Sequence, residues 1–277
     1  MKTGDLEVDE DFELDPEIVE VARGLAIQAG EVTLRYFGQR VAADTKADGT
    51  PVTKADREAE ELLRSEIRTR YPEHSLLGEE FGEHLGTAPV RWILDPIDGT
   101  RAYIRGVPLY AVLIGIEVGG EAVAGVVHLP ALGETVVARK GAGCSWWPSP
   151  GAVSVPARVS EVPTLGSALA LTTDPERVLE PEFEQTWRAL CGRVDLLRGW
   201  GDAYGHVLVA TGRAEVMIDP VLSPWDAAPL LPILTEAGGQ FTDLRGVCTI
   251  HGGSGVSSNG HLHGPVMEIL RSSESVS

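Results

Sequence analysis

The stretch Trp92-Ile93-Leu94-Asp95-Pro96-Ile97-Asp98-Gly99-Thr100 combines an apolar strand with an acidic turn. The strand runs into two carboxylates, Asp95 and Asp98, that lie three residues apart. Such a pair stabilises a sheet edge poorly, but it is well suited to hold a hard divalent cation. Gly99 and Thr100 can open a helical turn, and the N–H groups of a helix start bind phosphate readily. The combination predicts phosphoryl chemistry, whereas either aspartate alone would be interpreted as a turn former.

Length and charge bound the possible functions. With 277 residues, 43% of them hydrophobic, the chain can form one large domain or two closely packed halves. We divide it into a disordered acidic tail over 1–15 and a single domain over 16–277, with a metal-binding half (16–150) and a substrate-side half (151–277). The net charge of −18 argues against a nucleic-acid or anionic-membrane partner. A small phosphorylated substrate would therefore depend on bound cations that reverse the local sign of the charge.

Targeting signals and cysteine spacing exclude several classes of protein. No apolar run approaches the roughly 20 residues of a membrane span, and the acidic N-terminus does not resemble a secretory signal, so we expect a cytoplasmic location. Cys144, Cys191 and Cys248 lie too far apart for a zinc finger or a disulfide scaffold.

Apolar periodicity predicts alternating helices and strands. In the first half we expect a helix from Pro16 to near Gly38, a second helix capped by Thr53, and a meander over 110–118, 122–129 and 135–139. The segments 41–51, 82–89 and 141–150 are predicted to be loops. In the second half we expect strands over 168–172, 194–197, 214–219 and 241–243, and helices over 182–191, 204–211 and 263–270. A further helix starts at Asp226 as N-cap and is bent by Pro232. This order predicts a layered α/β arrangement.

Several strings resemble one known family. Asp-Pro-Ile-Asp-Gly-Thr after Trp-Ile-Leu is similar to the metal-binding signature of the inositol monophosphatase superfamily, whose members are magnesium-dependent, lithium-sensitive phosphomonoesterases. Lys46 to Asp56, Gly-Glu-Glu at 78–80, and Trp-Asp…Glu-Ala-Gly-Gly at 225–239 follow the same family order. The resemblance spans about residues 18 to 270. It implies an α+β fold, the layered α-β-α-β-α sandwich of the inositol monophosphatase and fructose bisphosphatase type, and a homodimer.

The resemblance also implies a site. Its metal ligands would be Glu79, Asp95, the Ile97 carbonyl, Asp98 and Asp226, which hold two or three Mg²⁺ ions, with Mn²⁺ as another possibility. Glu79, Asp56 and Thr100 would be catalytic, the last two acting on the attacking water. The predicted substrate contacts are Lys46, Asp98, Gly99, Thr100, Asp202 and Asp219. On the residues alone, Asp56 is interpreted as a capping residue, and Glu79 with Glu80 as a solvated surface.

The substrate is predicted from a narrower resemblance. Residues 95–108 and 201–206, with Gly212-Arg-Ala, resemble the histidinol-phosphate phosphatase branch of the family. Asp202 and Asp219 would then face a cationic leaving group, although Asp202 equally suits the N-cap of a helix at Ala203. His206 is predicted to pack in that helix. Inositol-1-monophosphatase is the alternative activity, and a non-catalytic protein that binds cations or phosphorylated ligands is the alternative class.

Overall fold

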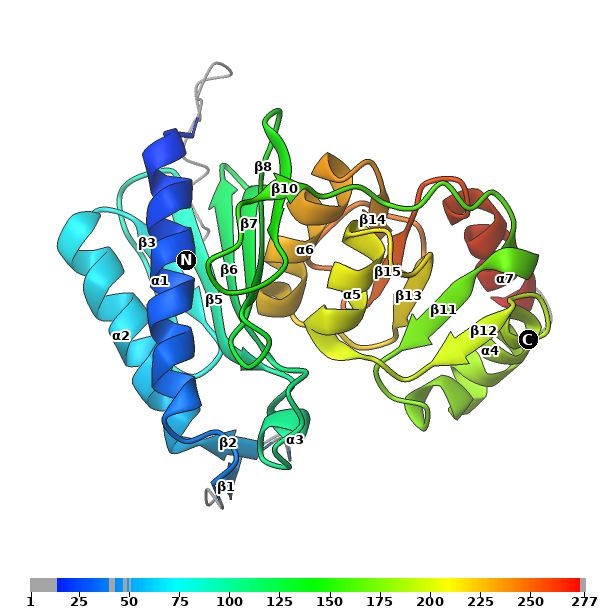
Figure 1. The fold of residues 1–277 in the computed structure, drawn as a ribbon, viewed down its shortest axis with the longest axis horizontal. Helices are drawn as coiled ribbons and strands as arrows, with labels where there is room; N and C mark the ends of the chain where they lie inside the picture. Colours follow the sequence, from blue (N-terminus) through cyan, green and yellow to red (C-terminus); the bar gives the residue numbers. More distant parts are fainter. Residues whose placement is uncertain (1–13, 40–42, 47–48, 50, 275–277) are drawn as a thin grey trace.

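A computed structural model describes residues 14–39, 43–46, 49 and 51–274. Figure 1 shows two β-sheets standing side by side, with helices on the outside of each and between them. The predicted acidic tail lies outside the described residues, apart from Leu14, which is buried, and Asp15. Asp15 accepts the Glu17 N–H at 2.9 Å and begins α1 (Pro16–Leu34) as predicted.

The outer layer of the first half consists of α1 and α2 (Lys54–Arg70), which pack against one sheet face. The apolar face predicted for α1 is buried at Ile18, Ala22, Leu25 and Ala29. A short antiparallel hairpin, β1 (Ala43–Thr45) and β2 (Pro51–Thr53), joins the two helices. The segment predicted as a polar loop over 41–51 therefore contains paired strands.

The first sheet has eight strands in the order β10-β9-β8-β7-β6-β5-β3-β4. The predicted meander is confirmed as β6, β7 and β8. Two predicted loops are wrong, because residues 82–84 pair with β3, and residues 143–147 pair with β8. The strands are β3 (Ser75–Gly78), β4 (Gly82–His84), β5 (Val90–Asp98), β6 (Ala111–Val118), β7 (Glu121–Leu129), β8 (Glu134–Arg139), β9 (Gly143–Trp147) and β10 (Val155–Pro156).

The second sheet has five strands in the order β12-β11-β13-β15-β14. Helices α5 and α6 lie between the two sheets, and α4 and α7 pack on the outer face of the second (Figure 1). The predicted layered α-β-α-β-α sandwich is confirmed. These elements are β11 (Leu169–Thr172), α4 (Pro181–Cys191), β12 (Leu196–Arg198), α5 (Asp202–Ala210), β13 (Val216–Asp219), α6 (Pro224–Glu236), β14 (Gln240–Thr242), β15 (Gly255–Ser258) and α7 (His263–Glu274), with 3₁₀ turns over Leu165–Ser167 and Arg177–Leu179.

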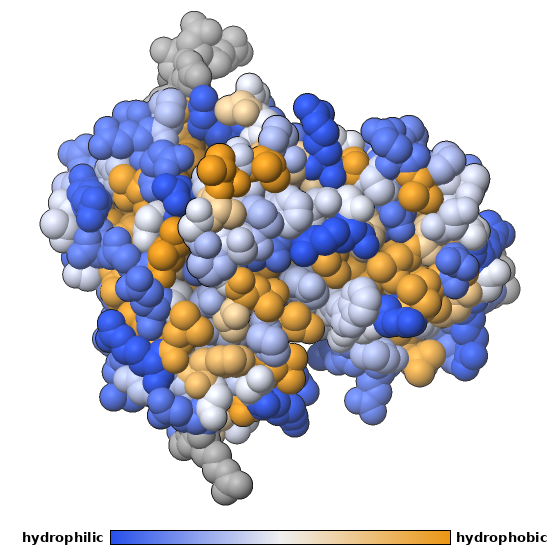
Figure 2. Space-filling model, viewed as in Figure 1, coloured by the Kyte–Doolittle hydropathy of each residue, from blue (hydrophilic) through white to orange (hydrophobic). Residues whose placement is uncertain are grey.

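In the described part of the chain, no helix is both long enough and apolar enough to cross a bilayer. Figure 2 shows apolar side chains on this face as separate patches among polar ones, and an indentation along the lower edge between the two halves. In Figure 1 the short helix α3 (Thr100–Tyr103) and the start of α2 lie at that lower side.

Helix α6 lies against the backbone of the first sheet. A Cβ at Gly115 would come within 2.5 Å of the Ala228 Cβ, and a Cβ at Gly125 within 2.2 Å of the Pro229 carbonyl oxygen. Two glycines on adjacent strands therefore set how closely the helix approaches. Because Asp226 is in the first turn of α6, this packing also sets the position of its carboxylate.

We expect Gly125→Ala to lower the free energy of unfolding by about 2 kcal/mol, because the added methyl group meets rigid backbone. Gly24→Ala is the matched control: Gly24 lies inside α1 with no heavy atom within 4 Å of an added Cβ, so alanine should stabilise the helix by roughly 1 kcal/mol. Urea unfolding measures both. Equal midpoints for the two variants would contradict the close packing of α6.

Candidate active site

A β-bulge in β5 brings the two aspartates of the central stretch together. Asp95 pairs with Leu113 and Asp98 with Ala111, so three steps on β5 match two steps on β6. In a regular strand, residues three apart point to opposite faces, and the extra residue of a bulge cancels that offset. Pro96 suits the bulge because it has no N–H to give to the ladder. The Asp95 Oδ1 accepts the Ile97 N–H at 2.9 Å, which closes the turn.

Asp226 completes a group of three carboxylates. One oxygen each of Asp95, Asp98 and Asp226 lies within 4.8 Å of the others. Asp226 is not the N-cap that we predicted: Ser223 caps α6, and its N–H donates to the Asp226 Oδ2 at 2.7 Å. The capping bond therefore holds one carboxylate oxygen of Asp226 at the start of the helix.

Glu79 lies beside this group and is held by a lysine. Its charge acts on Asp95 and on Asp226, and its Oε1 lies 2.6 Å from the Lys46 Nζ. The same ammonium donates to the Glu80 Oε1 at 2.6 Å. Burial lowers the pKa of Lys46, but the hydrogen bonds and charges of the two glutamates outweigh it and raise the pKa overall. Lys46, predicted as a substrate contact, is thus a charged partner of Glu79 and Glu80.

Asp56 and Thr100 meet as predicted. Asp56 is buried in the first turn of α2, where its Oδ2 accepts both the N–H and the hydroxyl of Thr53 in a capping box. Its other oxygen lies 3.5 Å from the Thr100 hydroxyl, which also donates to the Ile97 carbonyl at 3.0 Å. The structural and the functional interpretations of Asp56 therefore hold together, since each uses a different carboxylate oxygen.

Burial and mutual repulsion perturb these acids strongly. Burial first, and then the charges of Glu79, Asp98 and Asp226, raise the pKa of Asp95 well above its ordinary range. The pKa of Asp98 is raised well above that range by burial, with Asp202 and Asp226 adding to it. Burial raises the pKa of Asp226 to about 7 against the lowering effect of the Ser223 N–H. Several buried or partly buried carboxylates that repel one another, with oxygen atoms alone as donors, fit a hard divalent cation.

The second half contributes a polar chain that the sequence did not predict. The Ala203 N–H at the start of α5 donates to the Asp98 Oδ2 at 2.6 Å. Asp202 does not cap this helix; it is the helix's first residue, has φ +54°, and its N–H donates to the Thr173 hydroxyl at 2.8 Å. That hydroxyl donates in turn to the Asp219 Oδ2 at 2.5 Å. The Thr173 hydroxyl therefore connects the Asp202 backbone to the Asp219 carboxylate.

Gly99 and Asp202 are neighbours across the two halves. Gly99 has φ +81°, and an added Cβ there would lie 3.0 Å from the Asp202 Oδ2. Burial, followed by the charge of Asp219, raises the pKa of Asp202 to about 7, while Arg101 lowers it. His206 is fully buried in α5 and bonds the Ser257 hydroxyl through Nδ1 at 2.7 Å, as expected for a packed residue. The helical turn after Gly99 is real but only four residues long.

Comparison with known proteins identifies the relatives of this chain. The sequence profile of the inositol monophosphatase family matches residues 15–275. The chain belongs to this family. A histidinol-phosphatase of Chlorobaculum parvum is 46% identical over 89% of this chain and 93% of its own length. A histidinol-phosphatase of Mycobacterium tuberculosis is 38% identical over 90% and 96%. Among solved structures, the extragenic suppressor protein suhB of Bartonella henselae superposes with a TM-score of 0.84 at 28% identity, covering 92% of this chain and 98% of that one.

These findings confirm three predictions. The superfamily assignment and the inositol-monophosphatase-type fold are correct. Both curated relatives are phosphatases, so the chain falls in the predicted class of phosphoric monoester hydrolases.

Glu60 supports the Glu79 turn of this inositol monophosphatase family member. It lies one turn after Asp56 on α2 and is fully buried. Its carboxylate accepts the N–H of Glu80 at 2.8 Å and of Phe81 at 3.3 Å. Gly78 leaves the necessary room, because a Cβ there would come within 1.9 Å of the Glu60 Oε1. The spacing of four from Asp56 was a sequence signal that Glu60 shares the inner face of α2.

We expect Glu60→Ala to weaken Mg²⁺ binding about tenfold or more, because groups that orient metal ligands have effects of that size. Magnesium titrations of activity should show the shift, with a smaller loss of kcat at saturating metal. Glu61→Ala removes the same charge from an exposed neighbour and is the matched control. An unchanged magnesium requirement in Glu60→Ala would show that the turn holds its position without this carboxylate.

Proposed function

We propose that this protein is a Mg²⁺-dependent phosphomonoesterase that hydrolyses L-histidinol phosphate to L-histidinol and phosphate. The observation that carries the proposal is the convergence of Asp95, Asp98 and Asp226 within 4.8 Å, beside the Thr100–Asp56 pair. The names of the two curated relatives support the substrate. Inositol-1-monophosphatase activity is the second candidate, and the family to which the chain belongs supports it.

The proposed cation site consists of Glu79, Asp95, the Ile97 carbonyl, Asp98 and Asp226, and it takes two or three Mg²⁺ ions or, alternatively, Mn²⁺. Bound cations would supply charge neutralisation of the phosphate and a lowered pKa of the attacking water. Glu79 is held in place for this role by Lys46 and by the turn that Glu60 supports.

The proposed reaction is a direct displacement with no phospho-enzyme. The Thr100 hydroxyl would orient the attacking water, and the Asp56 Oδ1, which lies 3.5 Å from that hydroxyl, would accept the proton of the water. Gly99 lets the backbone approach the phosphate, and Asp98 keeps its geometry through the Ala203 N–H.

Asp202 is proposed to select the leaving group. It lies beside Gly99, and its carboxylate would pair with the ammonium or imidazole of histidinol. Asp219 supports it through Thr173. Lithium sensitivity, a homodimer and a cytoplasmic location are further expectations that rest on the family resemblance alone.

Phosphate release from histidinol phosphate and inositol 1-phosphate, measured side by side with Mg²⁺, tests the proposal. We expect the higher kcat/KM for histidinol phosphate. Asp202→Asn should raise the KM for histidinol phosphate about tenfold and change that for inositol 1-phosphate less, because only the leaving group of the first substrate carries a positive charge. A preference for inositol 1-phosphate would favour the second candidate, and no release from either would favour a non-catalytic binder.

A further inference from the structure

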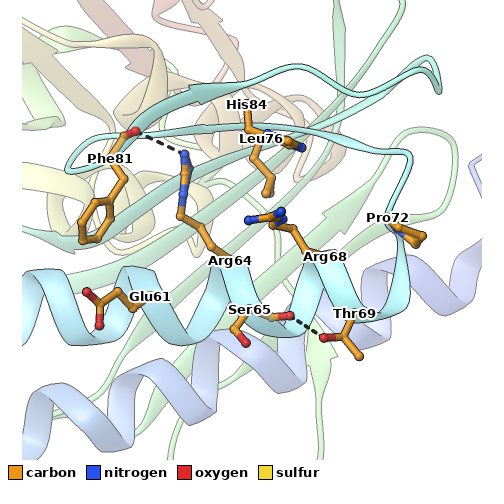
Figure 3. Close-up of a pocket in the computed structure, with 9 residues that line it drawn as sticks. All are labelled: Glu61, Arg64, Ser65, Arg68, Thr69, Pro72, Leu76, Phe81 and His84. Atoms are coloured by element: carbon orange, nitrogen blue, oxygen red, sulfur yellow. Dashed lines mark hydrogen bonds between the residues drawn. The ribbon is translucent and has the colours of Figure 1, made fainter.

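A cleft outside the carboxylate cluster lies between α2 and the β3–β4 hairpin. It has a volume of about 730 Å³, and none of its lining residues belongs to the proposed catalytic site. Leu76 contributes an apolar wall, and Arg64, Arg68 and His84 contribute the nitrogen atoms. Figure 3 shows both guanidinium groups and the imidazole on one side of α2, facing the hairpin. This volume is in the range of small-molecule sites.

Arg68 differs from the other arginines of α2. Arg57 pairs with Asp44 at 3.1 Å, Arg64 lies 3.5 Å from Glu60, and Arg70 pairs with Glu66 at 2.9 Å. No carboxylate partner of Arg68 occurs in the part of the chain that the structure describes. Within α2 its contact positions hold Arg64 and Ser65, and the helix ends at Arg70, so no acidic residue lies one turn away.

Glu60 balances the charge of Arg64, but no described carboxylate balances the charge of Arg68. Arg64 and Arg68 are four residues apart on one helix face, where like charges repel and destabilise the helix. This happens in a chain with a net charge of −18, where carboxylates are plentiful. Glu61 is the acidic residue among the lining side chains, and Figure 3 shows it at the other end of the cleft from Arg68. An anion between the two guanidinium groups would remove the repulsion.

We propose that this cleft binds a small dianion, either a phosphate-like oxyanion or a dicarboxylate, with Arg68 as the main ligand and Arg64 and His84 beside it. A guanidinium presents paired N–H donors that match two oxygens of such a group. Arg64 is fixed for this role, because it donates to the carbonyls of Phe81 and Gly82 at 3.4 and 2.6 Å. Those carbonyls lie in the β3–β4 hairpin, directly after Glu79 and Glu80 in the chain.

Calorimetric titration of the full chain with sulfate and with succinate, at low ionic strength, tests the proposal and separates the two ligand types. The titration is made in Mg²⁺ and again after metal removal with EDTA and dialysis of the chelator, when the unneutralised catalytic carboxylates repel anions and the cleft is the site that remains. We expect saturable one-to-one binding of at least one anion in both conditions. Arg68→Ala should weaken it at least about tenfold, because the charged two-point contact is lost.

Arg70→Ala is the matched control, since it removes the same charge two residues further along α2, on a different helix face, from an arginine that already has a partner. It should leave the affinity within about twofold, because exposed charges outside the site are screened. His84→Gln should weaken binding because the imidazole N–H is lost, and melting temperatures verify that each variant is folded. Equal losses in Arg68→Ala and Arg70→Ala, or no saturable binding of either anion, would overturn the proposal.

Discussion

Asp98→Asn is expected to lower kcat about a thousandfold, because it removes a charge on which both cation binding and phosphate neutralisation depend. The amide has nearly the same shape as the carboxylate and retains an oxygen that can accept the Ala203 N–H, now at 2.6 Å. Loss of activity should therefore occur without loss of fold.

The same variant should be more stable than the parent when metal is absent. Asp98 is repelled by Asp202, Asp226 and Asp219, and a neutral side chain ends that repulsion. The test is whether Asp98→Asn lowers the rate of phosphate release but raises the melting temperature in EDTA. Asp44→Asn makes the same chemical change at an exposed ion pair and should affect neither quantity. Near-normal turnover by Asp98→Asn would remove it from the proposed ligand set.

The second large effect is a loss of stability of the metal-free protein as the pH rises from about 5 to about 8. Burial raises the pKa of Asp226, Asp202 and Glu80 to about 7 in the folded state, and the charge of Glu79 adds to this for Asp226 and Glu80, as that of Asp219 does for Asp202. In the unfolded chain these groups titrate near pH 4, so between pH 4 and 7 the folded state holds protons that the unfolded state has released. Their stabilising contribution is present below about pH 4 and is lost as the pH passes 7, and the largely buried Asp226 and Asp202 can each contribute roughly a few kcal/mol.

Magnesium should flatten this dependence and raise the melting temperature throughout, since ligand binding releases the same protons and replaces their charge. Unfolding curves at several pH values, with EDTA and with Mg²⁺, measure the difference. Ordinary surface carboxylates are already ionised above about pH 5. Buried His128, whose pKa burial lowers to about 4, gives an opposite trend below about pH 6.5, but that trend is the same with and without metal, so the difference between the two curves reports on the acidic cluster. Parallel curves in the two conditions, or a melting temperature that does not respond to chelation, would contradict the metal assignment.

The parts of the site that could be predicted are those determined by local sequence. Asp56 and Asp226 each lie three residues after a Thr or Ser cap, and Asp95 and Asp98 flank the proline of a bulge. A few consecutive residues therefore determine where each of these carboxylates lies. The contact of Asp98 with Ala203 spans 105 residues, and no local pattern indicates it. The left-handed conformation of Asp202 and the bonding of Lys46 to Glu79 and Glu80 likewise follow from packing between distant segments.

The strand predictions that failed have a common cause. Strand β4 contains a glycine, a glutamate and a histidine, and β9 begins with glycine, so neither has the apolar alternation of an internal strand. Each segment is a strand because it pairs with a neighbouring strand: β4 pairs with β3 at the sheet edge, and β9 lies between β8 and β10. Tertiary pairing therefore makes these segments extended although their composition does not indicate a strand, because strand propensity depends on context.

The bulge in β5 has a consequence for how this protein tolerates variation. Ile97 has no partner in the ladder, and its carbonyl oxygen points to the Thr100 hydroxyl as part of the proposed ligand set. A main-chain oxygen survives every amino-acid exchange at its position, so apolar replacements of the buried Ile97 side chain would leave this corner of the site in place. An insertion or deletion between Asp95 and Asp98 would remove this carbonyl from the site. Related sequences should therefore conserve the spacing of the two aspartates more strictly than the identity of residue 97.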